Sequence, residues 1–384
     1  MAQGGAYRIC GGSAGAEVAV QQPVVGHSIA DSPRATASIE VSGATATLGT
    51  VDITTVADDL IVAHRAGPGS EVVRLTDLQP NSIHHIGNNE VHTLSRPEGQ
   101  LLCRIGTVND LHFGETEAGK IDDDPRGPIQ RVEPGEPPHP ETMNHAAVAE
   151  MAAADLAAVV VKGDLTNDGT DEEFGSFEAS YRAAFGDRLH VTRGNHDAYR
   201  GQQAYTGDEW IDLPGVSIAL LDTVIPEQTT GTISPAQLQW LDDLSAAADR
   251  PVVVMGHHQQ WVAGVRNNGY FGLDPDSADG LTEVVANNPG IVAYTAGHTH
   301  RHRVRYMSCG VPSIEVGCVK DFPGTWAEYR VYEGGIMQVV HRMSSPEALR
   351  WSDRCRHLMS DFGIDYEKYA LGNLEDRCFN IPQR

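Results

Sequence analysis

Short apolar runs, separated by polar and glycine-rich stretches, recur between residues 101 and 297. Valine, isoleucine, leucine and alanine dominate these runs, which is typical of strands that are buried on both faces of a parallel sheet. Helical segments lie between them, and this alternation predicts an α/β domain. The runs are LLCRIGTV (101–108), LAAVVVKG (156–163), RLHVT (188–192), VSIALLD (216–222), PVVVMG (251–256) and IVAYTAG (291–297).

Two stretches between the runs carry clear local signals. In ISPAQLQWL, Ser234 predicts an N-cap, Pro235 the first helical position and Gln237 the partner in a capping box. Residues 114–140 are instead rich in proline, glycine and charge. A loop of this length is either functional or a surface insertion. We interpret it as a lid that shapes specificity.

The chain before residue 101 has a different pattern. Residues 1–25 are rich in glycine, alanine and glutamine, which predicts a flexible segment. Residues 26–98 contain short β-like runs with glycine, proline and asparagine between them, which predicts a β-sandwich domain without helices. Residues 75–94 resemble the strand–turn–strand corner of fibronectin type III-like sandwiches, although the usual corner tyrosine is missing. The runs are ASIEV (37–41), ATATL (44–48), DLIVAH (59–64) and EVVRL (71–75).

The chain after residue 297 completes the predicted organisation. Residues 309–343 read as the strands that close a second sheet, so the catalytic domain is predicted to span residues 101–345. Residues 346–384 form a C-terminal extension of mixed helical and irregular character. Arg354 and Arg377 in this extension are interpreted as solvated surface charges rather than phosphate ligands.

Composition and charge narrow the function. The chain has 384 residues and a formal net charge of −24, which disfavours binding to nucleic acid. An anionic substrate would then need a local source of positive charge, such as a metal ion. The six cysteines form no C-x-x-C pair and no disulfide framework. With no signal peptide and no stretch long enough for a membrane span, we expect a cytoplasmic protein without a membrane partner.

Five of the apolar runs are followed by residue types that commonly bind metals. In open α/β sheets, sites form beyond the carboxyl ends of the strands, so these five ends are expected to share one site. Each motif is weak by itself, but their joint occurrence is hard to ascribe to unrelated surface residues. The residues are Asp110 and His112 in NDLH, Asp164 in GD, Asn195, His196 and Asp197 in GNHD, His257 and His258 in GHH, and His298 and His300 in GHTH.

Imidazole, carboxylate and amide oxygen suit two divalent cations with about four to six ligands each. Asp164 is the natural bridge, because one carboxylate can give an oxygen to each ion. Two ions roughly 3.5–4 Å apart lower the pKa of a shared water and neutralise charge on a phosphoryl group. The lack of cysteine in these motifs argues against a structural zinc site.

The motif set DLH…GD…GNHD…GHH…GHTH resembles the calcineurin-like metallophosphoesterases over residues 101–345. GDLTNDGTDEEF and LDT…GTISPAQLQWL narrow the resemblance to the class III cyclic-nucleotide phosphodiesterase-like branch. The resemblance implies a four-layered α/β/β/α sandwich and two metal ions (Mn, Fe or Zn). Purple acid phosphatases are disfavoured, because the tyrosine ligand that they carry after the GD aspartate is absent.

The resemblance also assigns roles to the residues. It implies that His196 is a general acid or transition-state stabiliser and that Asp197 orients it. Either histidine of GHH could bind metal, and the family pattern favours His257 over His258. His302 is interpreted as a supporting or surface residue. The implied ligands are Asp110, His112, Asp164 and His300 for the first metal, and Asp164, Asn195, His257 and His298 for the second.

These residues predict a hydrolase of phosphodiester bonds in a small phosphorylated molecule, by attack of a metal-bridging hydroxide on phosphorus. One alternative is a phosphomonoesterase that acts on a small phosphorylated metabolite, since both reactions use the same two-metal attack. A second alternative is a non-catalytic metal-binding scaffold, although such proteins are expected to lose ligands that are all present here. A nuclease is disfavoured by the charge. The sequence leaves the oligomeric state open, including a homo-oligomer.

Overall fold

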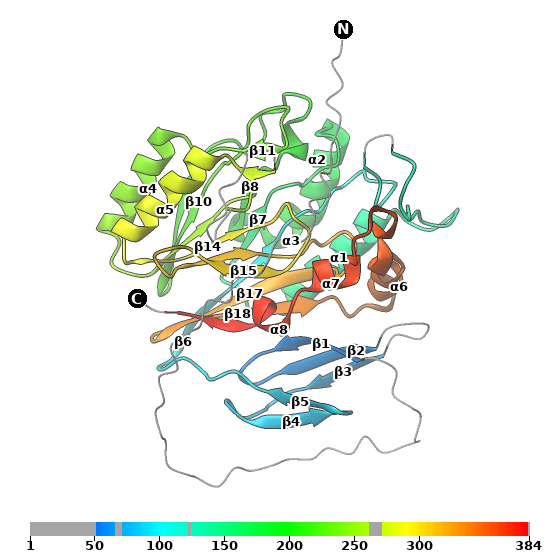
Figure 1. Ribbon diagram of the computed structural model, residues 1–384, viewed down its shortest axis with the longest axis horizontal. Coiled ribbons are helices and arrows are strands. Elements are labelled where there is room, and N and C mark those ends of the chain that lie inside the picture. Colours follow the sequence, from blue (N-terminus) through cyan, green and yellow to red (C-terminus); the bar gives the residue numbers. More distant parts are fainter. Residues whose placement is uncertain (1–50, 66–70, 122–123, 261–270, 383–384) are drawn as a thin grey trace. The chain divides into compact units, whose positions relative to one another are not determined.

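The computed structural model describes residues 51–65, 71–121, 124–260 and 271–382. Two six-stranded sheets form the centre of the catalytic region (Figure 1). The first has the strand order β19-β18-β17-β6-β7-β8, and β6, β7 and β8 run parallel. Its strands are β6 (Leu101–Val108), β7 (Ala158–Lys162), β8 (Leu189–Thr192), β17 (Thr325–Tyr332), β18 (Gly335–Arg342) and β19 (Phe379–Ile381).

The second sheet has the order β15-β16-β14-β12-β10-β9, and β10, β12, β14 and β16 run parallel. All six apolar runs of the sequence are strands of these two sheets, which confirms the predicted α/β alternation. The strands of the second sheet are β9 (Glu209–Leu213), β10 (Val216–Leu220), β12 (Val252–Met255), β14 (Ile291–Ala296), β15 (Arg303–Tyr306) and β16 (Pro312–Glu315).

Side-chain alternation along the strands divides the core into layers. In β7, Val160 faces the core between the two sheets, whereas Val159 and Val161 face the core beneath α1. In β12, Val253 and Val254 divide in the same way between the inter-sheet core and the core beneath α4 and α5. The described helices are α1 (His139–Ala153), α2 (Asp171–Phe177), α3 (Ala183–Phe185), α4 (Pro235–Ala247), α5 (Pro275–Asn287), α6 (Pro346–Arg354), α7 (Tyr366–Leu371) and α8 (Leu374–Arg377).

The predicted helix start is confirmed in α4. The Ser234 side chain accepts a hydrogen bond from the Gln237 backbone N–H, and the Gln237 side chain accepts one from the Ser234 N–H. These reciprocal bonds satisfy two donors that the first turn of a helix leaves unpaired. Within the described part of the chain, no helix combines the length and apolar content needed to cross a membrane.

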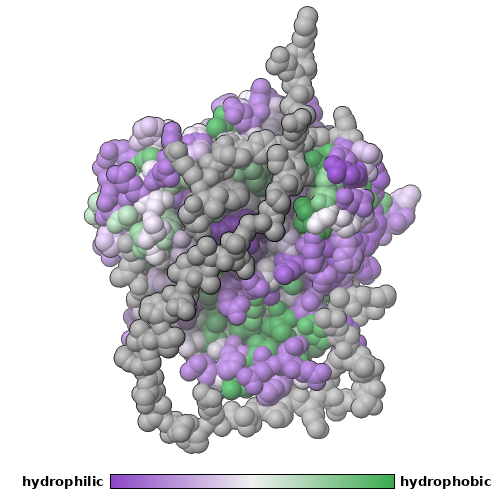
Figure 2. All heavy atoms as spheres, viewed as in Figure 1, coloured by the Kyte–Doolittle hydropathy of each residue, from purple (hydrophilic) through white to green (hydrophobic). Residues whose placement is uncertain are grey.

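The described residues before β6 form strands and no helix, as predicted. An antiparallel sheet of order β1-β2-β3 is followed by the hairpin β4-β5. Figure 2 shows hydrophobic residues over these strands. The Thr55 hydroxyl of β1 donates to the Val340 carbonyl of β18 over 2.7 Å. The fibronectin-like topology and the boundary at residue 98 stay predictions, and the runs at 37–48 lie outside the described residues. The strands are β1 (Val51–Val56), β2 (Ile61–Arg65), β3 (Val72–Leu75), β4 (Ile83–Ile86) and β5 (Asn89–His92).

Two expectations about the chain after residue 300 are corrected. Residues 309–343 do not close one sheet, because β16 pairs with β14 in the second sheet while β17 and β18 belong to the first. Arg377 is not a solvated charge: it is 3% exposed and donates to the carbonyls of Ile53 and Thr54 in β1. The extension also supplies β19, which pairs with β18.

The loop 114–140 is held by backbone hydrogen bonds in its described part. Ala118 and Gln130 exchange two of them across the loop. Gly127 donates to the Asp361 carboxylate and accepts from the Asp361 N–H, over 2.9 Å each. The loop is thus attached to the C-terminal extension, and its role as a lid stays a prediction.

Candidate metal centre

The loops after β6 and β7 are joined backbone to backbone. The N–H groups of Leu111 and His112 both donate to the Asp164 carbonyl, over 2.8 and 3.0 Å. This pairing continues the parallel β6–β7 ladder and brings Asp110, His112 and Asp164 to one edge of the sheet. The two loops are therefore joined through their backbones at the point where these side chains lie.

Backbone strain concentrates on the predicted ligands. Five of the ten non-glycine residues with a left-handed φ in the described chain are predicted metal ligands. Such conformations are unfavourable for residues with a Cβ and occur mostly at functional sites. The five are Asp110 (56°), His112 (49°), Asp164 (51°), His298 (69°) and His300 (53°).

The ligands predicted for the first metal lie together. His112 Nε2 is 3.5 Å from Asp164 Oδ2, and His300 Nε2 is 3.5 Å from Asp110 Oδ1. The donor atoms of Asp110, His112 and His300 all lie within 4.8 Å of one another. All four side chains come from loops after parallel strands.

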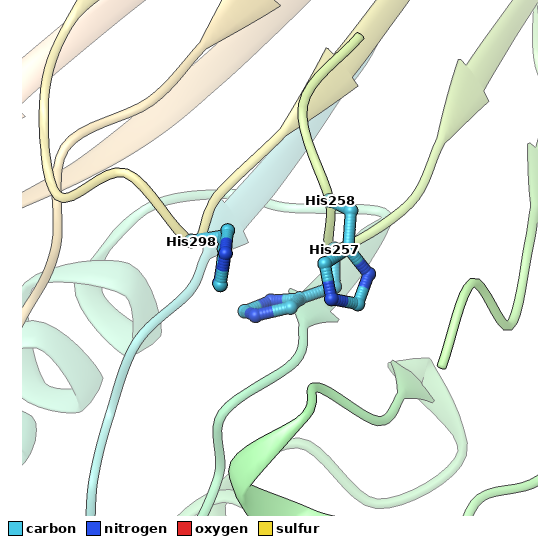
Figure 3. Close-up of side chains that lie close together, drawn as sticks. All are labelled: His257, His258 and His298. Atoms are coloured by element: carbon cyan, nitrogen blue, oxygen red, sulfur yellow. The ribbon is translucent and has the colours of Figure 1, made fainter. Parts of the chain in front are cut away.

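The ligands predicted for the second metal gather on the other side of Asp164. His257 Nε2 lies 3.3 Å from Asp164 Oδ2 and 3.1 Å from Asn195 Oδ1. The imidazoles of His257 and His298 approach each other from the ends of β12 and β14, with ring centroids 5.0 Å apart (Figure 3). Asp164 therefore lies between two groups of donors.

The hydrogen bond of His257 to Lys162 leaves its Nε2 facing two oxygen acceptors, and a cation would satisfy all three atoms. Its Nδ1 donates to the Lys162 carbonyl over 2.8 Å, since a carbonyl oxygen can only accept. In the neutral ring, the lone pair of Nε2 then points at the oxygens of Asp164 and Asn195, which are also acceptors. Burial lowers the pKa of His257, but Asp164 outweighs it and raises the pKa to about 9. Either a proton on Nε2 or a metal ion between the three atoms would provide the missing positive charge.

Other buried nitrogens at the site also lack partners. Neither ring nitrogen of His112 has a hydrogen-bond partner in the described chain, and neither does Nε2 of His298. Burial, followed by the charge of His196, holds the pKa of His112 well below its usual range, so protonation is disfavoured. Buried polar groups are normally paired, and an ion is one explanation when they are not. The donor set thus fits a metal centre.

His258 has a different environment from its neighbour. Its Nδ1 lies 2.8 Å from the Thr223 hydroxyl, and its Nε2 is buried without a hydrogen-bond partner in the described part of the chain. The donor atoms of His257, His258 and His298 lie within 4.8 Å of one another. His257 alone of the two histidines is placed against both Asp164 and Asn195, and the ligand assignment stays a prediction.

His196 lies beside the first group. Its ring centroid is 4.5 Å from that of His112, and its N–H donates to Asp164 Oδ1 over 3.0 Å. Its Nδ1 donates to the Asn167 carbonyl over 2.7 Å, which leaves Nε2 for chemistry. A donor atom of His196 also lies within 4.8 Å of those of His112 and Asp164, so proximity alone does not separate an acid from a ligand.

The expectation that Asp197 orients His196 directly is corrected. The Asp197 carboxylate accepts from the backbone N–H groups of Leu165, Thr166 and Gly194, over 3.2, 2.9 and 2.7 Å. Burial, and then the nearby Asp164, raise the pKa of Asp197 to about 6. Asp197 thus joins the GD and GNHD loops, while a backbone carbonyl sets the His196 ring.

Several residues near the site carried no sequence motif. Lys162 is buried beneath it with Nζ 3.3 Å from the Thr295 hydroxyl, and burial lowers the pKa of this lysine to about 7. Lys320 donates to Glu115 over 2.8 Å and lies 3.1 Å from Asp321. Asp321 in turn lies 3.9 Å from His300 Nδ1. Apart from the neighbours Lys320 and Asp321, the members of these pairs are distant in sequence, and no spacing rule could have connected them.

His302 has a structural role. It is 1% exposed, its Nδ1 accepts from the Gly317 N–H over 3.2 Å, and its Nε2 lies 3.1 Å from the Thr325 hydroxyl. Both ring nitrogens are therefore used in packing the loop against the strands beside it. The surface alternative is excluded.

The class of protein follows from the fold and from a family match. The model of the calcineurin-like phosphoesterases matches residues 103–302, just over half of the chain. The chain belongs to this family and is a metallophosphoesterase-type hydrolase. The family implies divalent metal ions, and the clusters around Asp164 are candidate ligands for them.

The individual relatives include both phosphodiesterases and a phosphatase, so they do not define the substrate. A probable cyclic nucleotide phosphodiesterase of Synechococcus sp. is 26% identical over 189 residues, 46% of this chain and 72% of the relative. A probable glycerophosphodiester phosphodiesterase of Arcobacter nitrofigilis is 26% identical over 177 residues, 41% of this chain and 64% of the relative. A solved dimetal phosphatase from Danio rerio has a TM-score of 0.50 at 17% identity and covers 63% of this chain and 97% of its own. That likeness supports the fold.

Proposed function

We propose that this protein hydrolyses phosphodiester bonds in a small phosphorylated molecule, with two metal ions (Mn, Fe or Zn) as cofactors. The observation that carries the proposal is the position of Asp164, with His112 Nε2 at 3.5 Å and His257 Nε2 at 3.3 Å from one carboxylate oxygen. Asp164 would bridge the ions. The other ligands would be Asp110, His112 and His300 on one side, and Asn195, His257 and His298 on the other.

Bound metal ions would supply an activated water and neutralise phosphoryl charge. The chain's own residues supply orientation and a proton. The bond from His257 Nδ1 to the Lys162 carbonyl fixes the tautomer and aims Nε2 at Asp164. The bond from His196 Nδ1 to the Asn167 carbonyl does the same for His196, and its protonated Nε2 would donate to the departing oxygen.

The charges beside the site support a diester over a monoester. A phosphate diester carries one negative charge, whereas a monoester carries nearly two at neutral pH. Lys320 is buried and held between Glu115 and Asp321. The charge of this lysine is already compensated by two carboxylates, which favours the less charged substrate.

The proposal is tested with metal-free protein and two small esters. Bis-p-nitrophenyl phosphate and p-nitrophenyl phosphate are compared with manganese, iron and zinc added in turn. We expect metal-dependent hydrolysis that is faster for the diester. Faster hydrolysis of the monoester would favour the phosphomonoesterase alternative, and two bound ions without hydrolysis of either ester would favour the scaffold.

A further inference from the structure

Helix α7, in the C-terminal extension, contacts the loop that carries two of the proposed ligands. The Tyr369 hydroxyl donates to the Thr299 carbonyl over 2.9 Å. Thr299 stands between His298 and His300, so this bond holds the peptide group that links Thr299 to His300. The family match ends at residue 302, and α7 lies beyond it.

The end of α7 is docked closely against the same loop. The His302 N–H donates to the Ala370 carbonyl over 3.0 Å. At Gly372, where φ is +60°, an added Cβ would lie 2.3 Å from the His302 carbonyl oxygen. Only glycine allows the chain to pass at this distance. The contact is therefore a fitted backbone-to-backbone interface.

A second tyrosine of α7 is connected to His300 through a carboxylate. The Tyr366 hydroxyl donates to Asp321 Oδ1 over 2.9 Å. The other oxygen of Asp321 lies 3.9 Å from His300 Nδ1, on the opposite side of the ring from the nitrogen that faces Asp110. Carboxylates placed behind a ligating histidine orient the ring and raise its basicity.

The loop needs such support because of its backbone. His298 and His300 have φ values of 69° and 53°, which residues with a Cβ adopt only when the surroundings enforce them. The His298 N–H is held by the Asp110 carboxylate over 3.1 Å, and the Tyr369 hydroxyl holds the next part of the loop, the peptide group before His300. A ligand loop held in this way pays less ordering entropy when an ion binds.

We propose that α7 is a positioning element of the metal centre and that Tyr369 is a positioning residue for His298 and His300. The inference rests on the proposed function, since it assumes that these histidines bind metal. It adds a determinant of metal affinity outside the family region. Tyr366 acts in the same direction, through Asp321, on His300 alone.

The test is Mn²⁺ binding to metal-free, full-length protein by isothermal titration calorimetry. Tyr369→Phe removes the hydroxyl and keeps the ring under Arg301, whose guanidinium carbon lies 5.1 Å from the ring centroid. We expect the Kd for Mn²⁺ to rise about tenfold, the lower end for loss of an outer ligand partner. The melting temperature of the metal-free variant should stay near that of the wild type.

Tyr306→Phe is the matched control, because Tyr306 lies on β15 just after the loop and is 52% exposed. An unchanged Kd in Tyr369→Phe overturns the proposal, whether or not the variant melts earlier, as does an equal change in Tyr306→Phe. If Tyr369→Phe fails to fold, Tyr366→Phe provides the test: a higher Kd for Mn²⁺ than that of Tyr306→Phe supports the proposal, and an unchanged Kd overturns it. A wild-type protein that binds no Mn²⁺, Fe or Zn would instead contradict the proposed function.

Discussion

Two buried histidines in different parts of the molecule differ in what their ring nitrogens contact. His64, in β2, has Nδ1 2.7 Å from the Thr54 hydroxyl and Nε2 3.4 Å from the Ser344 hydroxyl. His112, at the centre, is 3% exposed, and neither of its nitrogens has a hydrogen-bond partner within the described residues, although Nε2 lies 3.5 Å from Asp164 Oδ2. Burial is the same in both regions. The missing partners, rather than burial, indicate which histidine is prepared for an ion.

The histidines of the two regions also differ in their pKa values. Burial, and then Arg342 and Arg74, lower the pKa of His64 to about 3. At the centre, Asp164 outweighs burial and raises the pKa of His257 to about 9. The N-terminal sheet holds a neutral imidazole between hydroxyls, whereas the centre places imidazoles around carboxylates. Only the second arrangement attracts cations.

The largest effect is expected at the proposed bridge. Asp164→Asn keeps the size of the side chain and removes the charge that both groups of donors share. We expect the loss of at least one metal and a fall of activity to near background, with the fold retained. Elemental analysis and circular dichroism check this. Two ions per chain with full activity would rule out the bridging role.

His196→Ala should lose activity without losing metal. We expect both ions to remain and the rate to fall by about 10²–10⁴, the usual range for a positioned acid. The fall should be smaller for esters with good leaving groups, which need less protonation. Loss of one ion in this variant would show that His196 is a ligand.

Substitution of the two adjacent histidines of GHH should affect metal binding to different degrees. His257→Gln removes the nitrogen that faces Asp164 and Asn195, so we expect the loss of one ion. His258→Gln removes a supporting ring, and we expect metal affinity to fall by about tenfold at most. Equal losses of metal in the two variants would place His258 among the ligands. Calorimetric titration with Mn²⁺ measures both.

The smallest effect on the centre is expected at His64. His64→Gln should leave metal content and activity at neutral pH unchanged and should change how the free energy of unfolding depends on pH in acid. Because the folded pKa of about 3 is below the ordinary 6.5, the unfolded chain binds the proton more tightly as pH falls. The histidine's contribution is therefore complete above pH 6.5 and is lost toward pH 3.

This predicts a difference between wild type and His64→Gln that depends on pH. Between the two pKa values, the free energy of unfolding of the wild type should fall relative to the variant by about 1.4 kcal/mol per pH unit. Urea titrations from pH 7 to pH 4 measure it. Parallel curves for the two proteins would mean that His64 is already protonated in the folded state or is solvated.

Much of the fold could be predicted because its signals are local. The strand β7 is apolar from Ala158 to Val161 because both of its faces are covered, and that property is visible in the sequence. The capping box of Ser234 and Gln237 lies within one turn. The predicted ligands could be grouped because each follows a strand, and parallel strands deliver their ends to one edge.

Only the tertiary structure decided which partners those residues have. Asp197 meets the N–H groups of Leu165 and Thr166 rather than the ring of its neighbour, because two loops fold over one carboxylate. The hydroxyl of Tyr369 finds a carbonyl 70 residues earlier, and Lys320 finds a carboxylate 205 residues earlier. Residue types and local periodicity thus determined the elements and the kind of chemistry. The contacts that hold the ligands in place depend on distances across the fold, which sequence spacing does not contain.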